Sequence, residues 1–537
     1  MAKDYFQSYE FNRLLTFYKQ QKDEKRKRIY LDAEEFADIA DYYLSVDLPI
    51  SAMEAVDIGL SIHPDSDILL IMKSSINIFQ FQFKEAEAIL ADLDEDDPDV
   101  MYQLAQLQYA YHHNIPKAEE LWRRWLKMEN ESEDEEYKRE NYIHIMSTIS
   151  VLYNPADVSD NRQMVAKIAR RWVHEYIETF QPLGKYDCDV QLIDICREND
   201  LPDLMSEVLT QVLEEQPYLP QGWSTLALSR YVQKEYEQAL EACAFALAIN
   251  PDDIEALLTK AYTLYDIDDK HGARFVFKEY IDKGGELVQI LPYAEILFSE
   301  GEIEEAKSQL LFLTKHLEND KKRQEDKKLK ISKDSIEEYQ EADAAYESFM
   351  ELYKKIMADV GGIYYRNECY RRSLSIYSAL IEEGYNSSEE YFMLGLNHLA
   401  MKQVDKALGA FEQSLSNAED KVMRGIDIAI VFAMNNYDEY ALEMFKVVDV
   451  FAARGNCPSV KNIAAAKSLT YLKLGDIEQF LPFFKIACKD TPELIQKVYS
   501  NYFPDDLPVS EWYDYAKREI KTLLKKISKE GAHIVGF

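Results

Sequence analysis

Residues 220–251 read PQGWSTLALSRYVQKEYEQALEACAFALAINP, and this stretch decides the fold of the whole chain. It contains a small residue, Ala239, with Cys243 four positions later and Ala227 twelve positions earlier. The same spacing returns about every 34 residues, around these small residues: Ala52, Ala86, Ala118, Ala239, Ala273, Ala306, Ser373, Ala407 and Ala441. A fixed period of this size predicts an array of stacked units.

The residue four positions after each small residue is large and apolar in most units. Positions i and i+4 share one face of a helix. The small side chain therefore lets a second helix approach closely, and the large companion packs against that second helix. One helical pair cannot bury both of its faces, whereas a stack of pairs can. The companions are Val56, Leu90, Trp122, Cys243, Phe277, Leu310, Tyr377, Phe411 and Phe445.

The pattern resembles the tetratricopeptide repeat (TPR) family, as found in bacterial multi-TPR proteins. The unit of that family is two antiparallel helices with W-x2-L-G-x2-Y, then A-x3-F, then P. In residues 220–251 the resemblance rests on Trp223, Leu226, Ala227, Tyr236, Ala239, Ala246 and Pro251. The family's second aromatic residue falls on Arg230, and Cys243 replaces its Phe. The resemblance implies an all-α solenoid, a superhelix of about ten or more helix-turn-helix repeats of about 34 residues.

Breaks in the period divide the chain into seven predicted segments. These are an N-terminal helix (1–32), a first array (33–128), a divergent helical segment (129–185), a second array (186–318), a charged linker and helix (319–353), a third array (354–494) and a C-terminal capping helix (495–537). Whether 129–185 and 319–353 contain true repeats stays open. The last helix has one apolar face, and an alternative role for it is docking to a partner.

The chain is acidic, with 97 Asp and Glu against 61 Lys and Arg and a net charge of −36. Nucleic acids and anionic membranes both attract clustered Lys and Arg, so we predict neither as a partner. The acidity keeps a large helical surface in solution; the alternative is that it steers a partner with basic groups. The six cysteines show no C-x2-C spacing and no signal-type apolar stretch is present, which predicts a cytoplasmic location.

Motifs of catalysis and metal binding are absent from the sequence. It has no phosphate-binding loop, no nucleophile elbow and no zinc-protease motif. Asp92, Asp94 and Asp96 begin like a calcium loop, but Asp97 stands where that loop needs glycine. We therefore predict no catalytic residue, no cofactor and no metal, and a protein that is not an enzyme.

The resemblance also implies where binding occurs. In TPR proteins the first helix of each unit lines a concave groove through its positions 2, 5, 9 and 12. Residues predicted for the groove by this register are Tyr231, Leu258, Tyr262, Tyr265, Glu295, Phe298, Tyr365 and Phe392. The alternative is that such side chains pack against the adjoining helix.

One subset of the family clamps the carboxylate of chaperone C-termini with Lys and Asn at positions 5 and 9. Leu258 and Tyr262 occupy those positions here, so the clamp is absent from this unit. An apolar, tyrosine-rich groove suits a helix or an extended apolar segment. The sequence predicts a non-catalytic scaffold that binds a protein or peptide segment. The alternative is a regulatory or assembly subunit that docks into a larger complex through its terminal helices.

Overall fold

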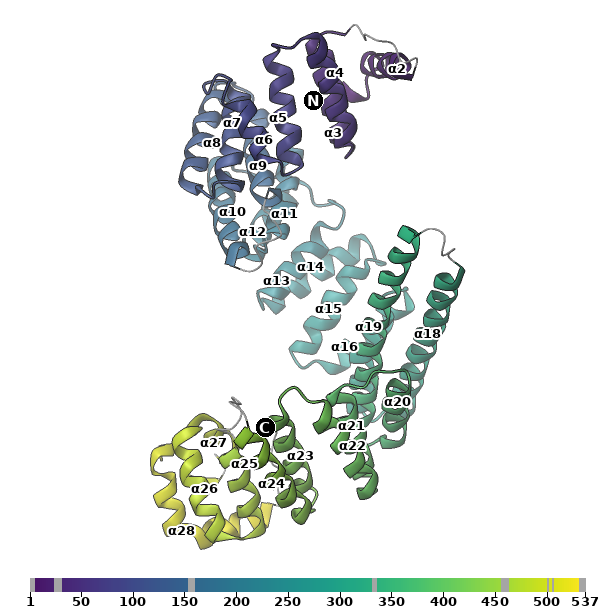
Figure 1. The fold of residues 1–537 in the computed structure, drawn as a ribbon, viewed down its shortest axis with the longest axis vertical. Helices are drawn as coiled ribbons and strands as arrows, with labels where there is room; N and C mark the ends of the chain where they lie inside the picture. The colour runs from purple at the N-terminus through teal and green to yellow at the C-terminus, as the bar shows by residue number, and fades with distance from the viewer. Residues whose placement is uncertain are drawn as a thin grey trace. The chain divides into compact units, whose positions relative to one another are not determined.

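The computed structural model describes residues 5–23, 31–152, 160–330, 336–454, 463–499, 502–504 and 507–530. Within these ranges the chain forms α-helices joined by short turns, with some 3-10 structure and no β-strand (Figure 1). The predicted all-α repeat fold is confirmed. The chain divides into two compact units, Met1–Lys283 and Gly284–Phe537, while the seven finer segments remain a prediction.

In the first unit, helices that follow one another pack as pairs, such as α3 with α4 and α13 with α14. The first helix of a pair also contacts the first helix of the next pair, as α3 does with α5 and α13 with α15. The unit therefore is a stack. Its helices are α2 (Tyr9–Asp23), α3 (Ala33–Ser45), α4 (Pro49–Ile62), α5 (Asp67–Phe79), α6 (Phe83–Leu90), α7 (Pro98–Ala110), α8 (Ile115–Glu129), α9 (Glu135–Val151), α10 (Asp160–Thr179), α11 (Asp187–Glu198), α12 (Pro202–Glu215), α13 (Gly222–Val232), α14 (Tyr236–Ile249), α15 (Ile254–Asp266) and α16 (Lys270–Asp282).

The second unit is built in the same way, with α19 on α20, α21 on α22, α23 on α24 and α25 on α26. Its elements are the 3-10 turn η1 (Leu287–Gln289), α17 (Ile290–Ser299), α18 (Ile303–Lys330), α19 (Ile336–Arg366), α20 (Tyr370–Glu382), α21 (Ser388–Ala400), α22 (Val404–Asn417), α23 (Lys421–Met434), α24 (Asp438–Arg454), α25 (Ile463–Leu474), α26 (Ile477–Asp490), α27 (Pro492–Tyr499) and α28 (Val509–Glu530).

The sequence period is a packing period. Each of the nine small residues and each of their nine companions is at most 4% exposed. Gly395 shows how close the helices come, because a Cβ added there would lie 2.5 Å from the ring of Phe411 on α22. Ala40, Ala227 and Ala261, which stand at the same place in other units, are fully buried.

Two glycines of the α21–α22 pair should therefore respond oppositely to the same substitution. Gly395→Ala is expected to destabilise the protein by about 1–3 kcal/mol, since Phe411 must shift to admit the methyl group. Gly409→Ala is expected to stabilise it by about 0.5–1 kcal/mol, because Gly409 lies exposed within α22 with nothing within 4 Å of the added Cβ. Urea unfolding followed by circular dichroism measures both; a loss of stability in both variants would contradict the close-contact account.

The turn inside each pair repeats a backbone feature that the sequence did not predict. In most pairs one residue of the turn has a left-handed φ of 54° to 63°, and the N–H of the next residue then donates to the carbonyl five positions before it. Thus the Glu235 N–H donates to the Arg230 carbonyl at 2.9 Å, and the Gln403 N–H donates to the His398 carbonyl at 2.8 Å. The left-handed residues follow the 34-residue period: Asp47 and Phe81; Asp200, Lys234 and Asp268; Glu368, Lys402 and Asn436.

Two side-chain amides also bond to backbone carbonyls that lie earlier in the chain. The Gln103 amide donates to the Ile71 carbonyl at 3.1 Å, and the Gln216 amide donates to the Gly184 carbonyl at 2.6 Å. In both cases the acceptor lies 32 positions earlier in the chain. The Ile71 carbonyl belongs to α5 and the Gly184 carbonyl to the loop before α11, so each bond ties a helix pair to backbone that precedes it in the chain.

Helices α18 and α19 are longer than their neighbours, with 28 and 31 residues, and they lie side by side (Figure 1). Their contacts include lysine over tyrosine: Lys321 Nζ lies 5.2 Å from the ring centre of Tyr353, and Lys328 Nζ lies 4.7 Å from that of Tyr346. Such contacts are cation–π interactions. The charged stretch after residue 319 thus continues α18, and α19 is one helix as far as Arg366.

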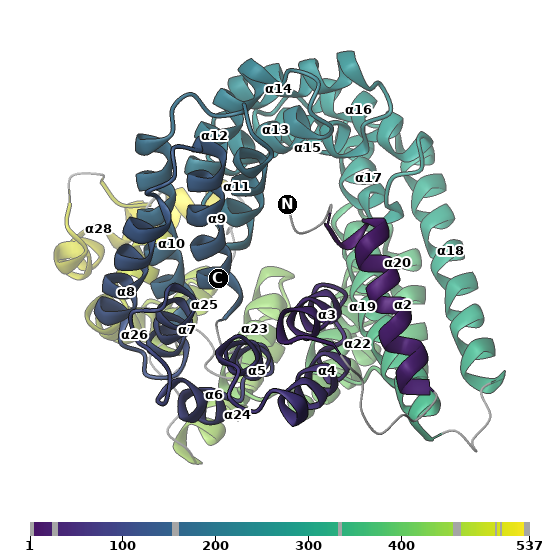
Figure 2. The ribbon, with the colours of Figure 1, turned by 90° about the horizontal axis from the view of Figure 1, so that it is seen from above.

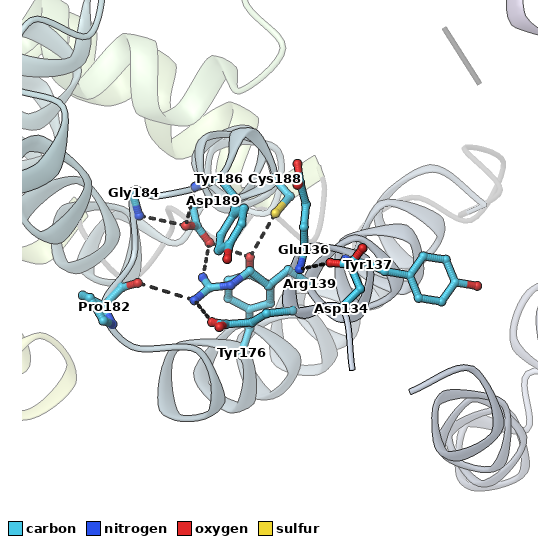
Figure 3. Close-up of polar contacts among 11 residues, drawn as sticks. Asp134, Glu136, Tyr137, Arg139, Tyr176, Pro182, Gly184, Tyr186, Cys188 and Asp189 are labelled. Atoms are coloured by element: carbon cyan, nitrogen blue, oxygen red, sulfur yellow. Dashed lines mark hydrogen bonds and ion pairs between the residues drawn. The ribbon is translucent and has the colours of Figure 1, made fainter. Parts of the chain in front are cut away.

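A buried ion pair joins the divergent segment to the second array (Figure 3). Arg139 of α9 is fully buried, and its Nη1 donates to Oδ1 of the equally buried Asp189 of α11 at 2.6 Å. Its guanidinium lies 5.0 Å from the ring centre of Phe180 and 4.9 Å from that of Tyr186. Burial alone lowers the pKa of Arg139, but its bonds to Glu135 and Asp189 raise that pKa above its ordinary value. Arg139 therefore stays charged.

Asp189 also binds the backbone that joins α10 to α11. Its Oδ2 accepts the Gly184 N–H at 2.8 Å, and its Oδ1 accepts the Tyr176 hydroxyl at 2.7 Å (Figure 3). Charged hydrogen bonds inside a protein are strong because little water competes with them. The Arg139–Asp189 pair thus joins α9, α10 and α11 where the repeat period is lost.

Helix α28 covers the end of the second unit. Trp512 is 3% exposed, its ring stacks on Phe503 at 4.3 Å, and its Nε1 donates to the Leu507 carbonyl at 2.8 Å. Ala516 and Leu523, on the same face, are buried in the cluster that includes Phe484 of α26. Helix α28 thus buries its apolar face against α26 and Phe503, as expected of a cap, and its capping role stays a prediction.

Candidate functional site

The predicted groove residues of the first unit lie on α13 and α15. Figure 2 shows that α11, α13 and α15 lie on the inner side of the first unit's row of helices, with α12, α14 and α16 on the outer side. Helices α13 and α15 contact each other directly. We call their open surface the inner strip; it comprises Leu228, Tyr231, Val232, Leu258, Tyr262, Tyr265 and Asp266.

Apolar side chains of the inner strip are open to solvent. Leu228 is 47% exposed and Val232 is 55% exposed, and their spacing of four places them on one face of α13. Leu258 and Tyr265 of α15 are half-buried. Tyr262 is half-buried too, and its ring meets that of Phe277 edge to face at 5.3 Å. The strip therefore combines large contact area with tyrosines held in place by packing.

A hydrogen bond joins the two helices across the strip. The Tyr231 hydroxyl donates to Asp266 Oδ2 at 2.9 Å. Burial and this bond raise the pKa of Tyr231 to about 12, so the phenol keeps its proton at neutral pH and remains a donor. Asp266 ends α15 and is exposed.

The four predicted residues of the second unit are placed differently. Glu295 of α17 forms an ion pair with Arg366 of α19. Phe298 is buried at 9% exposure, whereas Tyr365 is half-buried and packs on Tyr370 with ring centres 5.6 Å apart. Burial raises the pKa of Tyr365.

Phe392 of α21 is covered by an arginine. The Arg424 guanidinium of α23 lies 4.4 Å from the ring centre of Phe392 and donates to Glu389 Oε2 at 2.7 Å. The neighbouring Asp427 has its pKa raised to about 6 by burial, with Arg424 acting in the opposite direction. Phe392 therefore already has a cationic partner from its own chain.

The structure thus brings together Tyr231, Leu258, Tyr262 and Tyr265 in the first unit. The sequence missed Asp266, Arg366 and Arg424, which contact predicted groove residues from positions outside the four that the family register assigns. The sequence contains no signal for Asp266, because the equivalent position in the preceding unit, 34 residues earlier, is Val232.

A metal site, a reactive thiol and a membrane-spanning helix are three other features that would indicate a function for the described part of the chain. No group of three or more His, Cys, Asp and Glu there is placed to hold a metal ion. Burial raises the pKa of Cys243 to about 12, so this thiol stays protonated and is a weak nucleophile. None of the helices searched combines the length and the apolar character needed to cross a bilayer.

Comparison with known proteins gives a likeness in structure only. No family model matches the chain, and no curated protein matches it. Among solved structures, the chain is similar to YrrB, described as a TPR protein with an unusual peptide-binding site, at 14% identity and a TM-score of 0.30. The match covers 41% of this chain and 96% of that chain. A likeness this distant carries no functional argument, and the fold rests on the helix pairs described above.

Proposed function

We propose that this protein is a non-catalytic scaffold whose inner strip, between α13 and α15, binds a segment of a partner protein. The observation that supports this most is the exposure of Leu228 and Val232 beside a row of half-buried tyrosines. An exposed apolar patch with a polar rim is typical of an interaction site. Tyrosine is favoured in such sites because it offers a large apolar face and a polar tip.

The predicted groove residues differ between the two units in whether side chains of the same chain already contact them. In the second unit, Glu295 and Phe392 are engaged by Arg366 and Arg424 of the same chain. In the first unit, Leu228 and Val232 of the inner strip are 47% and 55% exposed. We therefore assign binding to the first unit, by a helix or an extended segment laid along α13 and α15.

The alternative from the sequence, docking through the terminal helices, is less favoured. The apolar face of α28 packs on α26 and on Phe503, so it is already covered. A docking helix would need that face free or an exchange of partners.

The variant Tyr262→Ala, Tyr265→Ala should weaken partner binding at least about 30-fold, since each central aromatic of an interface contributes about 2 kcal/mol. Partners are captured from native cell extract with the intact chain, identified by mass spectrometry and then titrated. The control is Tyr9→Ala, Tyr218→Ala, which removes two exposed tyrosines outside the inner strip.

Tyr262 packs on Phe277, so circular dichroism must show that the variant keeps its helicity. Val232→Glu is a second variant, because this exposed position tolerates a charge in the fold but not in an apolar interface. A partner that binds both variants as tightly as the parent chain would remove the inner strip from consideration.

A further inference from the structure

We infer that the segment bound on the inner strip brings a cationic side chain, arginine or lysine, to Asp266 within an otherwise apolar contact. This inference rests on the proposed function and specifies the chemistry of its partner. It starts from the carboxylate of Asp266, which the Tyr231 hydroxyl holds through Oδ2 at 2.9 Å. A carboxylate has room for further donors on its other oxygen.

Some acids on the first helices of other pairs already have an arginine partner. Asp194 of α11 pairs with Arg197 at 2.6 Å, and Glu389 of α21 pairs with Arg424 at 2.7 Å. Within the described ranges, no Lys, Arg or His of this chain forms an ion pair with Asp266. The charge of Asp266 is thus left for a group from outside the chain.

The charge and the apolar neighbours of Asp266 both favour a cationic side chain with an apolar stem. Residues 186–283 contain 20 acidic and 8 basic side chains, so the local field attracts cations. Asp266 is flanked by the exposed Ile267, and Val232 holds the equivalent place on α13. Arginine and lysine suit such a place because their apolar stems cover aliphatic and aromatic surface while the charge reaches the carboxylate.

The test uses two fluorescent synthetic peptides with one amphipathic helical pattern, the first of leucine and arginine and the second of leucine and glutamate. Fluorescence anisotropy with the full chain should show binding of the arginine peptide and none of the glutamate peptide. Asp266→Asn, which keeps an acceptor for Tyr231, should weaken binding of the arginine peptide about tenfold. The matched control is Glu241→Gln on α14, where the same charge is removed from an exposed site outside the strip.

Each possible result of the peptide titrations either supports or overturns the role of Asp266. A tenfold loss for Asp266→Asn with none for Glu241→Gln supports the inference. Equal losses would mean that net charge attracts the peptide, and the inference fails. Binding that Val232→Glu abolishes but Asp266→Asn leaves intact keeps the proposed groove and overturns the role of Asp266. If neither peptide binds, the inference fails, while capture of the native partner still decides the proposed function.

Discussion

Replacing Arg139 by methionine should destabilise the first unit by about 3–5 kcal/mol, the cost of leaving a buried charge without its partner. Asp189 would remain fully buried and would keep only the Tyr176 hydroxyl and backbone N–H groups as donors. The guanidinium also fills the space between Phe180 and Tyr186, which methionine fills only in part. Urea unfolding followed by tryptophan fluorescence measures the effect, because Trp122 and Trp172 lie buried in the same unit.

Arg124→Met is the matched control. Arg124 pairs with Asp96 at 3.0 Å, but both side chains are at least half exposed, and such surface pairs contribute about 0–1 kcal/mol. Similar small losses in both variants would show that the Arg139 pair does not hold the divergent segment together. A loss confined to Arg139→Met would confirm that one buried contact replaces the missing repeat packing.

Replacing Trp512 by alanine should cost about 3–5 kcal/mol of local stability at the end of the second unit. The substitution removes the ring that stacks on Phe503 and the bond to the Leu507 carbonyl, and it leaves a cavity beneath α28. Hydrogen exchange measured by mass spectrometry should show protection lost in α28 and then in α26, which it covers.

Trp512→Phe keeps an aromatic ring next to Phe503 but loses the indole N–H and part of the ring volume, so its cost should exceed the about 1 kcal/mol of the hydrogen bond and stay below that of Trp512→Ala. If α28 already exchanges freely in the parent chain, it does not cap the stack. In that case, docking through the terminal helix becomes the better account of its amphipathic face.

Much of the fold could be predicted because its repeat is local. A small residue such as Ala239 and a companion such as Cys243 lie one helical turn apart, so the chain itself sets their common face. The ion pair between Arg139 and Asp189 spans 50 positions, and nothing in either residue's own helix points to the other. The left-handed turns escaped prediction as well, since Phe81 is not a residue that favours this conformation.

The candidate site could be predicted only in part. The register placed Tyr231, Tyr262 and Tyr265 on inner helices, where the structure has them side by side with open apolar surface. It did not reveal that Arg424 covers Phe392, because that contact joins two neighbouring pairs and depends on how one stacks on the other. Which charged side chains meet between neighbouring helix pairs depends on how the pairs pack on each other. The sequence of a single repeat does not give that packing.

The bonds from Gln103 to Ile71 and from Gln216 to Gly184 have a mechanical consequence. Each pair is fastened chiefly to its immediate neighbours, so a small rotation between two pairs is passed along the row and adds up over its length. We therefore expect such a row to deform more between helix pairs than within them, because each pair keeps its own buried contacts.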